Sequence, residues 1–192
     1  MIHNFNIELD PLKGPVSAAF VNQNCIDLQS AFDYIRHLPY GRNSDKSNLL
    51  TIFQEQKGTC STKHAALKQM LDEQEIKGFE LVLGIFKMDE TYHQGVGALL
   101  KNYHLNYIPE AHNYLKFHGE IIDCTSQSST PDQFQNKLMF EEYIRPDQIN
   151  THKIELHKKF LSLWLESEKN KIPYTLEDIW QIREACISVL SQ

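Results

Sequence analysis

The sequence has few of the features that mark an exported, membrane-spanning or metal-stabilised protein. Its four cysteines, Cys25, Cys60, Cys124 and Cys186, lie far apart and none forms a C-x-x-C pair, so we expect no structural zinc site and no bound cofactor. Residues 1–14 contain no basic segment followed by an apolar stretch, unlike a signal peptide, and no apolar run approaches the ~20 residues of a membrane span. We therefore expect a cytoplasmic protein with free thiols and no membrane association.

Positive charge is also scarce. The formal net charge is -6, and the 19 lysines and arginines are scattered along the chain, whereas binding to a nucleic-acid backbone requires basic stripes. Hydrophobic residues make up 41% and charged residues 23% of the chain, which is an ordinary globular composition. With no internal repeat or low-complexity tract, the length of 192 residues predicts a single domain over 1–192 that does not bind nucleic acid.

Two helices are predicted in the first half of the chain. Apolar residues recur at helical spacing over 27–37, with Asp27 as the N-cap. A second helical pattern begins at Ser61, and Gly78 stands where a C-terminal cap is expected. Cys60 therefore lies at, or one residue before, a helix N-terminus.

Three strands are predicted after the second helix. Residues 79–88 form an apolar run typical of a buried strand. Residues 89–111 form a long polar connection, and connections of this length are often functional. Residues 112–117 and 120–125 are then expected to form two strands joined by a tight turn.

The C-terminal part of the chain is predicted to be helical. Apolar residues at helical spacing indicate one helix over 151–168. Thr175 and Asp178 form a capping box at the start of a last helix that reaches about Leu190. We expect these helices, over about 151–191, to form a hairpin packed on the core.

The position of Cys60 suits a nucleophile. The reactive form of a cysteine is the thiolate, and a free thiol has a pKa near 8.5 that the protein must lower. A helix N-terminus favours negative charge, and a nearby imidazole can form a thiolate–imidazolium pair. The local sequence also permits a simpler interpretation, in which Cys60 is a small buried apolar residue at a helix start.

The predicted hairpin can supply an imidazole and a carboxylate. With a two-residue loop at His118-Gly119, His112 and Asp123 are diagonal neighbours on one face; with the loop one residue earlier, they lie directly opposite each other. A three-residue loop without a bulge would put them on opposite faces. The geometry is thus permitted but not required, and both can also be partly exposed strand residues.

Three segments in this order resemble the transglutaminase-like core of the papain-like cysteine-enzyme superfamily. KGTCSTKHAALKQMLDEQEI is similar to the nucleophile segment of that family, and GFELVLGIF is similar to the strand that follows it. AHNYLKFHGEIIDCTS resembles the histidine strand, reverse turn and D-x-T strand, and the upstream LPYGR resembles the segment before the nucleophile. The resemblance covers roughly residues 26–126.

This resemblance implies Cys60 as nucleophile, His112 as general base and Asp123 as the residue that orients the base. The chain departs from the family pattern in two places. Asn113 follows the histidine where many members have an aromatic residue nearby, and Cys124 stands where proline often follows the aspartate. These departures affect the expected substrate class and pocket shape more than the three catalytic residues.

Acyl transfer also requires donors for an oxyanion. The backbone N–H of Cys60 is one candidate. Gln54 has the spacing from Cys60 that papain-like proteases use for a side-chain donor, and Gln56 is a rival. His64 lies on the same helix turn as Cys60 and could complete half of a metal site, although a packed or solvated histidine is the simpler interpretation.

The sequence therefore predicts an α+β fold in which the helix carrying Cys60 packs on a small antiparallel sheet, with a C-terminal helical hairpin. The expected chemistry is cysteine-dependent acyl transfer on a protein, peptide or small amide. Hydrolysis is our first choice over transamidation because it needs no second substrate site. The main alternative is a catalytically inactive transglutaminase-like binding module, and a third is a protein scaffold. The oligomeric state is not predicted.

Overall fold

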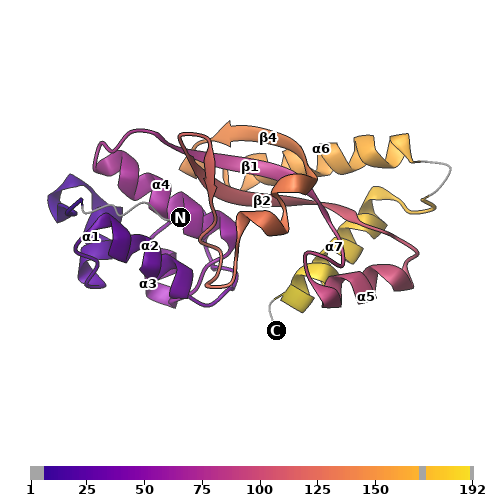
Figure 1. Cartoon of the computed structure of the whole chain (residues 1–192), viewed down its shortest axis with the longest axis horizontal. Coiled ribbons are helices and arrows are strands. Elements are labelled where there is room, and N and C mark those ends of the chain that lie inside the picture. The colour runs from indigo at the N-terminus through magenta and orange to yellow at the C-terminus, as the bar shows by residue number, and fades with distance from the viewer. Residues whose placement is uncertain (1–6, 169–171, 191–192) are drawn as a thin grey trace. The chain divides into compact units, whose positions relative to one another are not determined.

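The computed structural model describes residues 7–168 and 172–190 (Figure 1). The chain has an α+β structure with a small antiparallel sheet of four strands in the order β3-β2-β1-β4. The strands are β1 (Phe79–Met88), β2 (Ile108–Phe117), β3 (Glu120–Ile122) and β4 (Leu138–Ile144). Among the described residues, no helix is long and apolar enough to cross a bilayer.

The fold consists of two compact units, and each unit is built from three chain segments. Among the described residues, the first comprises 7–83, 113–131 and 142–150, and the second comprises 84–112, 132–141 and the described part of 151–190. Strands β1, β2 and β4 each contribute residues to both units. The prediction of one domain over 1–192 stays a prediction.

The first unit contains the helices of the N-terminal half. They are α1 (Pro15–Asn22), α2 (Leu28–His37), α3 (Thr51–Glu55) and α4 (Cys60–Glu73). Helix α4 contacts the other three, and the rings of Phe20 on α1 and Phe53 on α3 meet edge to face at 4.9 Å. As predicted, Asp27 caps α2: its carboxylate accepts a hydrogen bond from the Ser30 backbone N–H at 2.7 Å.

A tight hairpin joins β2 and β3. The paired residues are Leu115 with Ile122, Lys116 with Ile121, and Phe117 with Glu120, which leaves His118 and Gly119 as a two-residue loop. Both loop residues have positive φ, 49° and 88°, as a type I′ turn requires. The two-residue register is therefore confirmed from among the registers that the sequence allowed.

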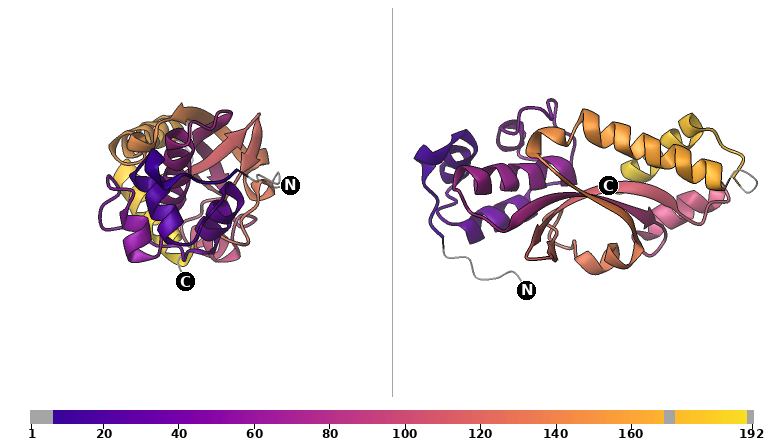
Figure 2. Two further views of the ribbon diagram at one scale, coloured as in Figure 1. Left: turned by 90° about the vertical axis from the view of Figure 1, so that its left-hand side faces the viewer. Right: turned by 90° about the horizontal axis from the view of Figure 1, so that it is seen from above.

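The second unit is dominated by three helices. They are α5 (Gln94–Asn102), α6 (Thr151–Ser167) and α7 (Leu176–Leu190). Helix α7 packs against both α5 and α6, and Figure 2 shows α6 in orange and α7 in yellow from two further directions. The predicted capping box is confirmed, since the Thr175 N–H donates to Asp178 at 2.9 Å and the Asp178 N–H donates to Thr175 at 3.2 Å.

Several features differ from the sequence prediction or were absent from it. Strand β2 begins at Ile108 and not at His112, and β3 ends at Ile122 and not at Thr125. Helix α4 ends at Glu73, and the residue in the left-handed conformation after its cap is Glu75, with φ of 59°, not Gly78. The Ile76 N–H donates back to the Leu71 carbonyl at 2.9 Å, so a Schellman turn ends the helix. Helix α1 and strand β4 were not predicted. Most of β4 is exposed, and its sequence, LMFEEYI, shows neither a continuous apolar run nor a regular alternation.

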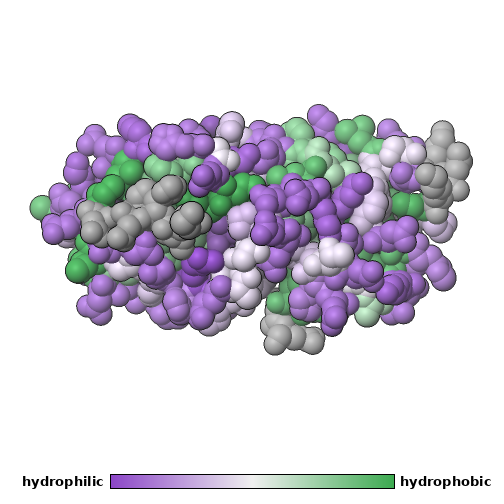
Figure 3. Space-filling view, in the orientation of Figure 1, coloured by the Kyte–Doolittle hydropathy of each residue, from purple (hydrophilic) through white to green (hydrophobic). Residues whose placement is uncertain are grey.

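Buried apolar side chains form the interior of each unit. The face drawn in Figure 3 is mainly hydrophilic, with hydrophobic residues in smaller areas. All four cysteines are buried free thiols. Burial raises the pKa of the Cys25 and Cys186 thiols to about 11, and both are thereby kept as inert packing groups at neutral pH.

The turn residue Gly119 offers a test of the hairpin. A Cβ at this position would meet nothing within 4 Å, so Gly119→Ala should act only through the positive φ and lower the free energy of unfolding by about 1 kcal/mol. Gly119→Asn should cost less, because asparagine tolerates this conformation. Urea unfolding measures both changes. Equal losses for alanine and asparagine would contradict the type I′ assignment.

Candidate functional site

Cys60 is the first residue of α4. Thr59 is the N-cap, and a capping box joins it to Thr62: the Thr59 side chain accepts from the Thr62 N–H, and the Thr59 N–H donates to the Thr62 hydroxyl at 3.0 Å. Cys60 is the only one of the four cysteines at a helix N-terminus. Its backbone position therefore favours a thiolate through the helix dipole.

The loop before the cysteine is held by hydrogen bonds from an upstream segment. Gly58 forms a bridge with Tyr40, and its N–H donates to the Pro39 carbonyl at 3.1 Å. The Asn43 side chain accepts from the Thr62 hydroxyl at 2.7 Å. The segment after α2 therefore supports both the loop before Cys60 and the first turn of α4.

His64, one turn after Cys60, is fully buried and packed. Its Nδ1 lies 2.7 Å from the Cys60 carbonyl oxygen, which can only accept, so Nδ1 carries a proton. Its Nε2 accepts from the Cys124 N–H at 2.7 Å. Both nitrogens are used in a neutral imidazole, which favours the packed interpretation over the metal half-site. In the described chain no three His, Cys, Asp or Glu side chains form a metal-binding group.

Asp123 follows β3 and is held next to this histidine. Its Oδ1 lies 3.5 Å from Nε2 of His64. The same oxygen accepts from the Thr125 N–H at 2.9 Å and from the Thr125 hydroxyl at 2.6 Å. Because His64 donates to the Cys60 carbonyl and accepts from the N–H of Cys124, the backbone beside Asp123 is tied to the first turn of α4.

Cys124 directly follows Asp123 and is fully buried. Burial raises the pKa of its thiol to about 12. At neutral pH it is therefore a protonated, unreactive thiol. Its functional contribution is its backbone N–H, which holds His64.

Lys63 was not singled out by the sequence, yet it is a fully buried lysine. Its Nζ donates to the Leu38 carbonyl at 2.5 Å and to the Thr125 carbonyl at 2.7 Å. Burial lowers the pKa of Lys63 to about 8. Its acidic neighbours Cys124, Asp123 and Cys60 raise the pKa of Lys63 only where they are ionised. Spacing of three and four residues from Cys60 places Lys63 and His64 near the cysteine's helix face, a signal that the sequence already contained.

Asn113 adds a further contact to the nucleophile turn. Its Oδ1 accepts from the Ser61 hydroxyl at 2.9 Å, and its Nδ2 donates to the Val82 carbonyl at 3.0 Å. From the sequence, Asn113 was notable only as a departure from the family pattern. In the structure it joins β2 to both α4 and β1 within the first unit.

His112 belongs to the second unit and directly precedes Asn113 in β2. Its side chain is buried among aromatic residues of that unit. The ring centroids of His112 and Phe134 are 4.9 Å apart, and those of His112 and Phe86 are 6.1 Å apart, both edge to face. The role of His112 as general base stays a prediction.

The two glutamine candidates differ in their surroundings. Gln54 on α3 is exposed and lines a surface hollow with Ala18 of α1. Gln56 has a φ of 52°, and its side-chain amide donates to the Phe53 carbonyl at 2.6 Å and to the Tyr34 hydroxyl at 3.0 Å. Gln56 therefore closes the end of α3, while the oxyanion role of Gln54 stays a prediction.

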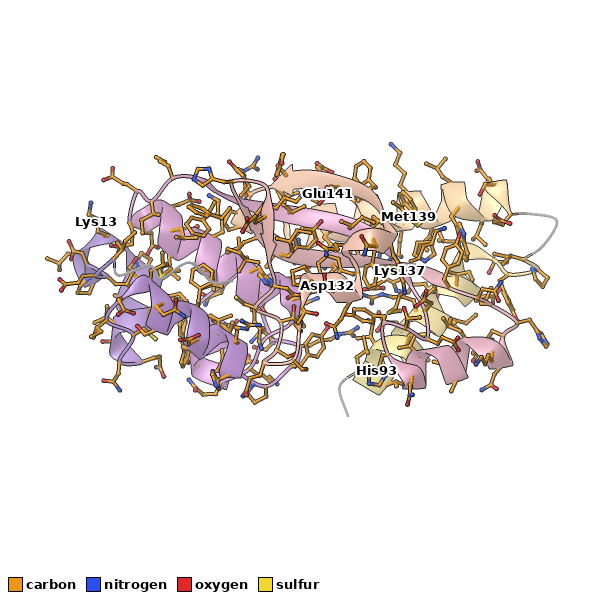
Figure 4. All side chains as sticks on the ribbon, viewed as in Figure 1. Lys13, His93, Asp132, Lys137, Met139 and Glu141 are labelled. Atoms are coloured by element: carbon orange, nitrogen blue, oxygen red, sulfur yellow. The ribbon has the colours of Figure 1, made fainter. Side chains whose placement is uncertain are left out.

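The connection 89–111 contains two exposed histidines. His93, labelled in Figure 4, caps α5 by accepting from the Gly95 N–H at 3.2 Å. His104 follows the same helix with a φ of 53°. Nearby, the Lys137 ammonium pairs with Asp89 at 2.5 Å. These contacts account for the local structure of the connection. They give no indication of a chemical role for it.

Comparison with known proteins finds no matching family model, no similar curated protein and no similar solved structure. The resemblance to the transglutaminase-like family therefore stays a prediction. The candidate site is defined by this chain's own contacts around the first turn of α4.

The pKa of Lys63 predicts a pH effect on stability. Between pH 8 and 10.5 the unfolded chain holds the lysine proton and the native chain releases it, so this lysine's contribution to the free energy of unfolding rises with pH. The advantage of the wild type over Lys63→Met should therefore grow across this window, by at most about 1.4 kcal/mol per pH unit. Urea unfolding at several pH values measures the difference. A difference that stays constant with pH would show that Lys63 is not perturbed.

Proposed function

We propose that this chain is a cysteine-dependent acyl-transfer enzyme of the transglutaminase-like class. Cys60 is the nucleophile, His112 the general base and Asp123 the group that orients His112. The observation that carries the proposal is the tie between the backbone beside Asp123 and the turn that begins with Cys60: His64 donates to the Cys60 carbonyl and accepts from the Cys124 N–H.

The proposed reaction follows from the chemistry of these groups. His112 accepts the proton of the Cys60 thiol, and the thiolate adds to the carbonyl carbon of an amide. The resulting oxyanion is stabilised by backbone N–H groups at the start of α4. The C–N bond then breaks, His112 gives its proton to the leaving amine, and a thioester remains on Cys60.

Release of the acyl group completes the cycle. Water or an amine gives a proton to His112 and attacks the thioester carbon. The C–S bond then breaks, a carboxylic acid or a new amide leaves, and His112 returns the proton to the Cys60 thiolate. We propose hydrolysis of a peptide or small amide as the main reaction, because it requires no second substrate site. No metal or cofactor takes part in these steps.

Two observations on the described residues support the assignment of roles. Cys60 begins a helix of 14 residues, whereas burial keeps the pKa of the Cys25, Cys124 and Cys186 thiols high. The hairpin also has the register that leaves a two-residue turn. In this register we expect His112 and Asp123 on one face of the hairpin.

One observation favours the non-catalytic binding module as the second candidate. Oδ1 of Asp123 accepts two hydrogen bonds from Thr125 and lies near His64. An aspartate with these contacts can hold a turn without taking part in a reaction. The reactivity of Cys60 separates the two candidates, because a binding module needs no activated thiol.

We predict that Cys60 reacts with iodoacetamide at a lower pH than an ordinary thiol. Alkylation of each cysteine is followed by mass spectrometry from pH 5 to 9 in the wild type and in His112→Ala. Loss of the imidazole should slow alkylation of Cys60 at pH 6 by about tenfold or more, because the thiolate pKa returns toward 8.5. Cys124 should stay unreactive in both proteins.

His157→Ala is the matched control, because His157 is also a buried histidine of the second unit. Its Nε2 lies 2.8 Å from the Pro109 carbonyl oxygen, and it has no assigned part in the reaction. Alkylation of Cys60 in this variant should follow the wild-type profile. If Cys60 titrates as an ordinary thiol in the wild type, or is inert in all three proteins, the catalytic proposal fails and the binding module takes its place.

A further inference from the structure

Lys63 has no part in the proposed reaction, although it lies in the helix turn after the nucleophile. A lysine side chain is almost never fully buried unless it is paired, and Lys63 is 0% exposed. Asp123 and Cys60, when ionised, favour the charged form of Lys63. Both are residues of the proposed site, so the location of this charge calls for a functional explanation.

The hydrogen bonds of Lys63 join three parts of the first unit. One acceptor is the carbonyl of Leu38, the C-cap residue of α2, where a positive charge also complements the helix dipole. The other is the carbonyl of Thr125, two residues after Asp123. A single ammonium on α4 therefore links the end of α2 to the segment that carries the proposed orienting carboxylate.

Lys63 and its neighbour His64 hold consecutive residues of that segment. Lys63 binds the Thr125 carbonyl, and His64 accepts from the Cys124 N–H. The histidine contact involves a neutral ring that accepts from the backbone of Cys124. The lysine contact adds a positive charge, which lowers the energy of anionic Cys60 and Asp123 in a buried environment.

We propose that Lys63 is a positioning residue of the Cys60 site, whose ammonium holds the 123–125 segment on α4 and stabilises the negative charges of Cys60 and Asp123. This inference rests on the proposed function, because it assigns Lys63 to the same reaction. A merely structural lysine would affect stability alone. A positioning lysine also sets the pH at which Cys60 becomes reactive.

The test uses Lys63→Met, which retains most of the side-chain volume and removes the charge. The alkylation midpoint of Cys60 should move upward by about one pH unit, since one nearby positive charge is lost. At pH 6 this corresponds to about tenfold slower reaction. Lys63→Arg keeps the charge and the donors and should restore most of the wild-type profile.

Lys68→Met is the matched control. Lys68 lies on the same helix, is partly exposed and pairs with Asp72. The Lys68→Met variant makes the same chemical change as Lys63→Met but leaves the buried charge of Lys63 in place. The alkylation profile of Cys60 should not change in this variant.

The outcomes separate this inference from the proposed function. If alkylation of Cys60 depends on His112 while Lys63→Met lowers only the thermal midpoint, Lys63 is a structural residue and the inference is overturned, although the proposed function stands. If Cys60 has no low alkylation midpoint in the wild type, the proposed function itself is overturned, and the role assigned to Lys63 fails with it.

A second measurement covers the case in which Lys63→Met does not fold. The 13Cε chemical shift of Lys63 in the wild-type protein reports its protonation between pH 6 and 10. A charged side chain at pH 7, which loses its proton within this range, agrees with the inference. A neutral side chain at pH 7 would overturn it, because the proposed stabilisation requires the ammonium.

Discussion

The complete burial of polar side chains on the first turns of α4 is the constraint on which the first unit depends. Ser61, Thr62, Lys63 and His64 all lie inside the protein, where an unsatisfied polar group costs several kcal/mol in an apolar environment. Each must find a partner within the chain, and each does. The partners come from the segment after α2, from β2 and from the segment after β3, so a single helix turn determines where these three segments lie.

This arrangement also divides the electrostatic roles among adjacent residues. Donation to the Cys60 carbonyl and acceptance from the Cys124 N–H leave His64 neutral. Lys63 supplies the positive charge beside it, at the cost of desolvation that appears as its lowered pKa. The neutral side chain of His64 and the charged side chain of Lys63 thus both bind the backbone of the segment 123–125, which contains Asp123.

The candidate site could be predicted in part. Cys60 was expected at a helix N-terminus, and the structure confirms α4 starting there. The prediction left His64 as a packed or solvated residue, and its actual partner is the backbone of Cys124, 60 residues away. No role was predicted for Lys63, because a lysine is ordinarily exposed. None was predicted for Asn113, because its partners Ser61 and Val82 come within reach only when the helix and strands are packed together.

The sequence by itself determined the elements that local physics controls. Asp27 caps α2, Thr175 caps α7, and a tight turn joins the two hairpin strands, because capping and turn formation involve residues within a few positions. The register of the hairpin was left open by the sequence and is fixed only in the structure. Only the tertiary structure decided which groups surround Cys60. The contact between Lys63 and Thr125 spans 62 residues, and no local pattern specifies such a partner, because it exists only once α4 and the end of β3 are packed together.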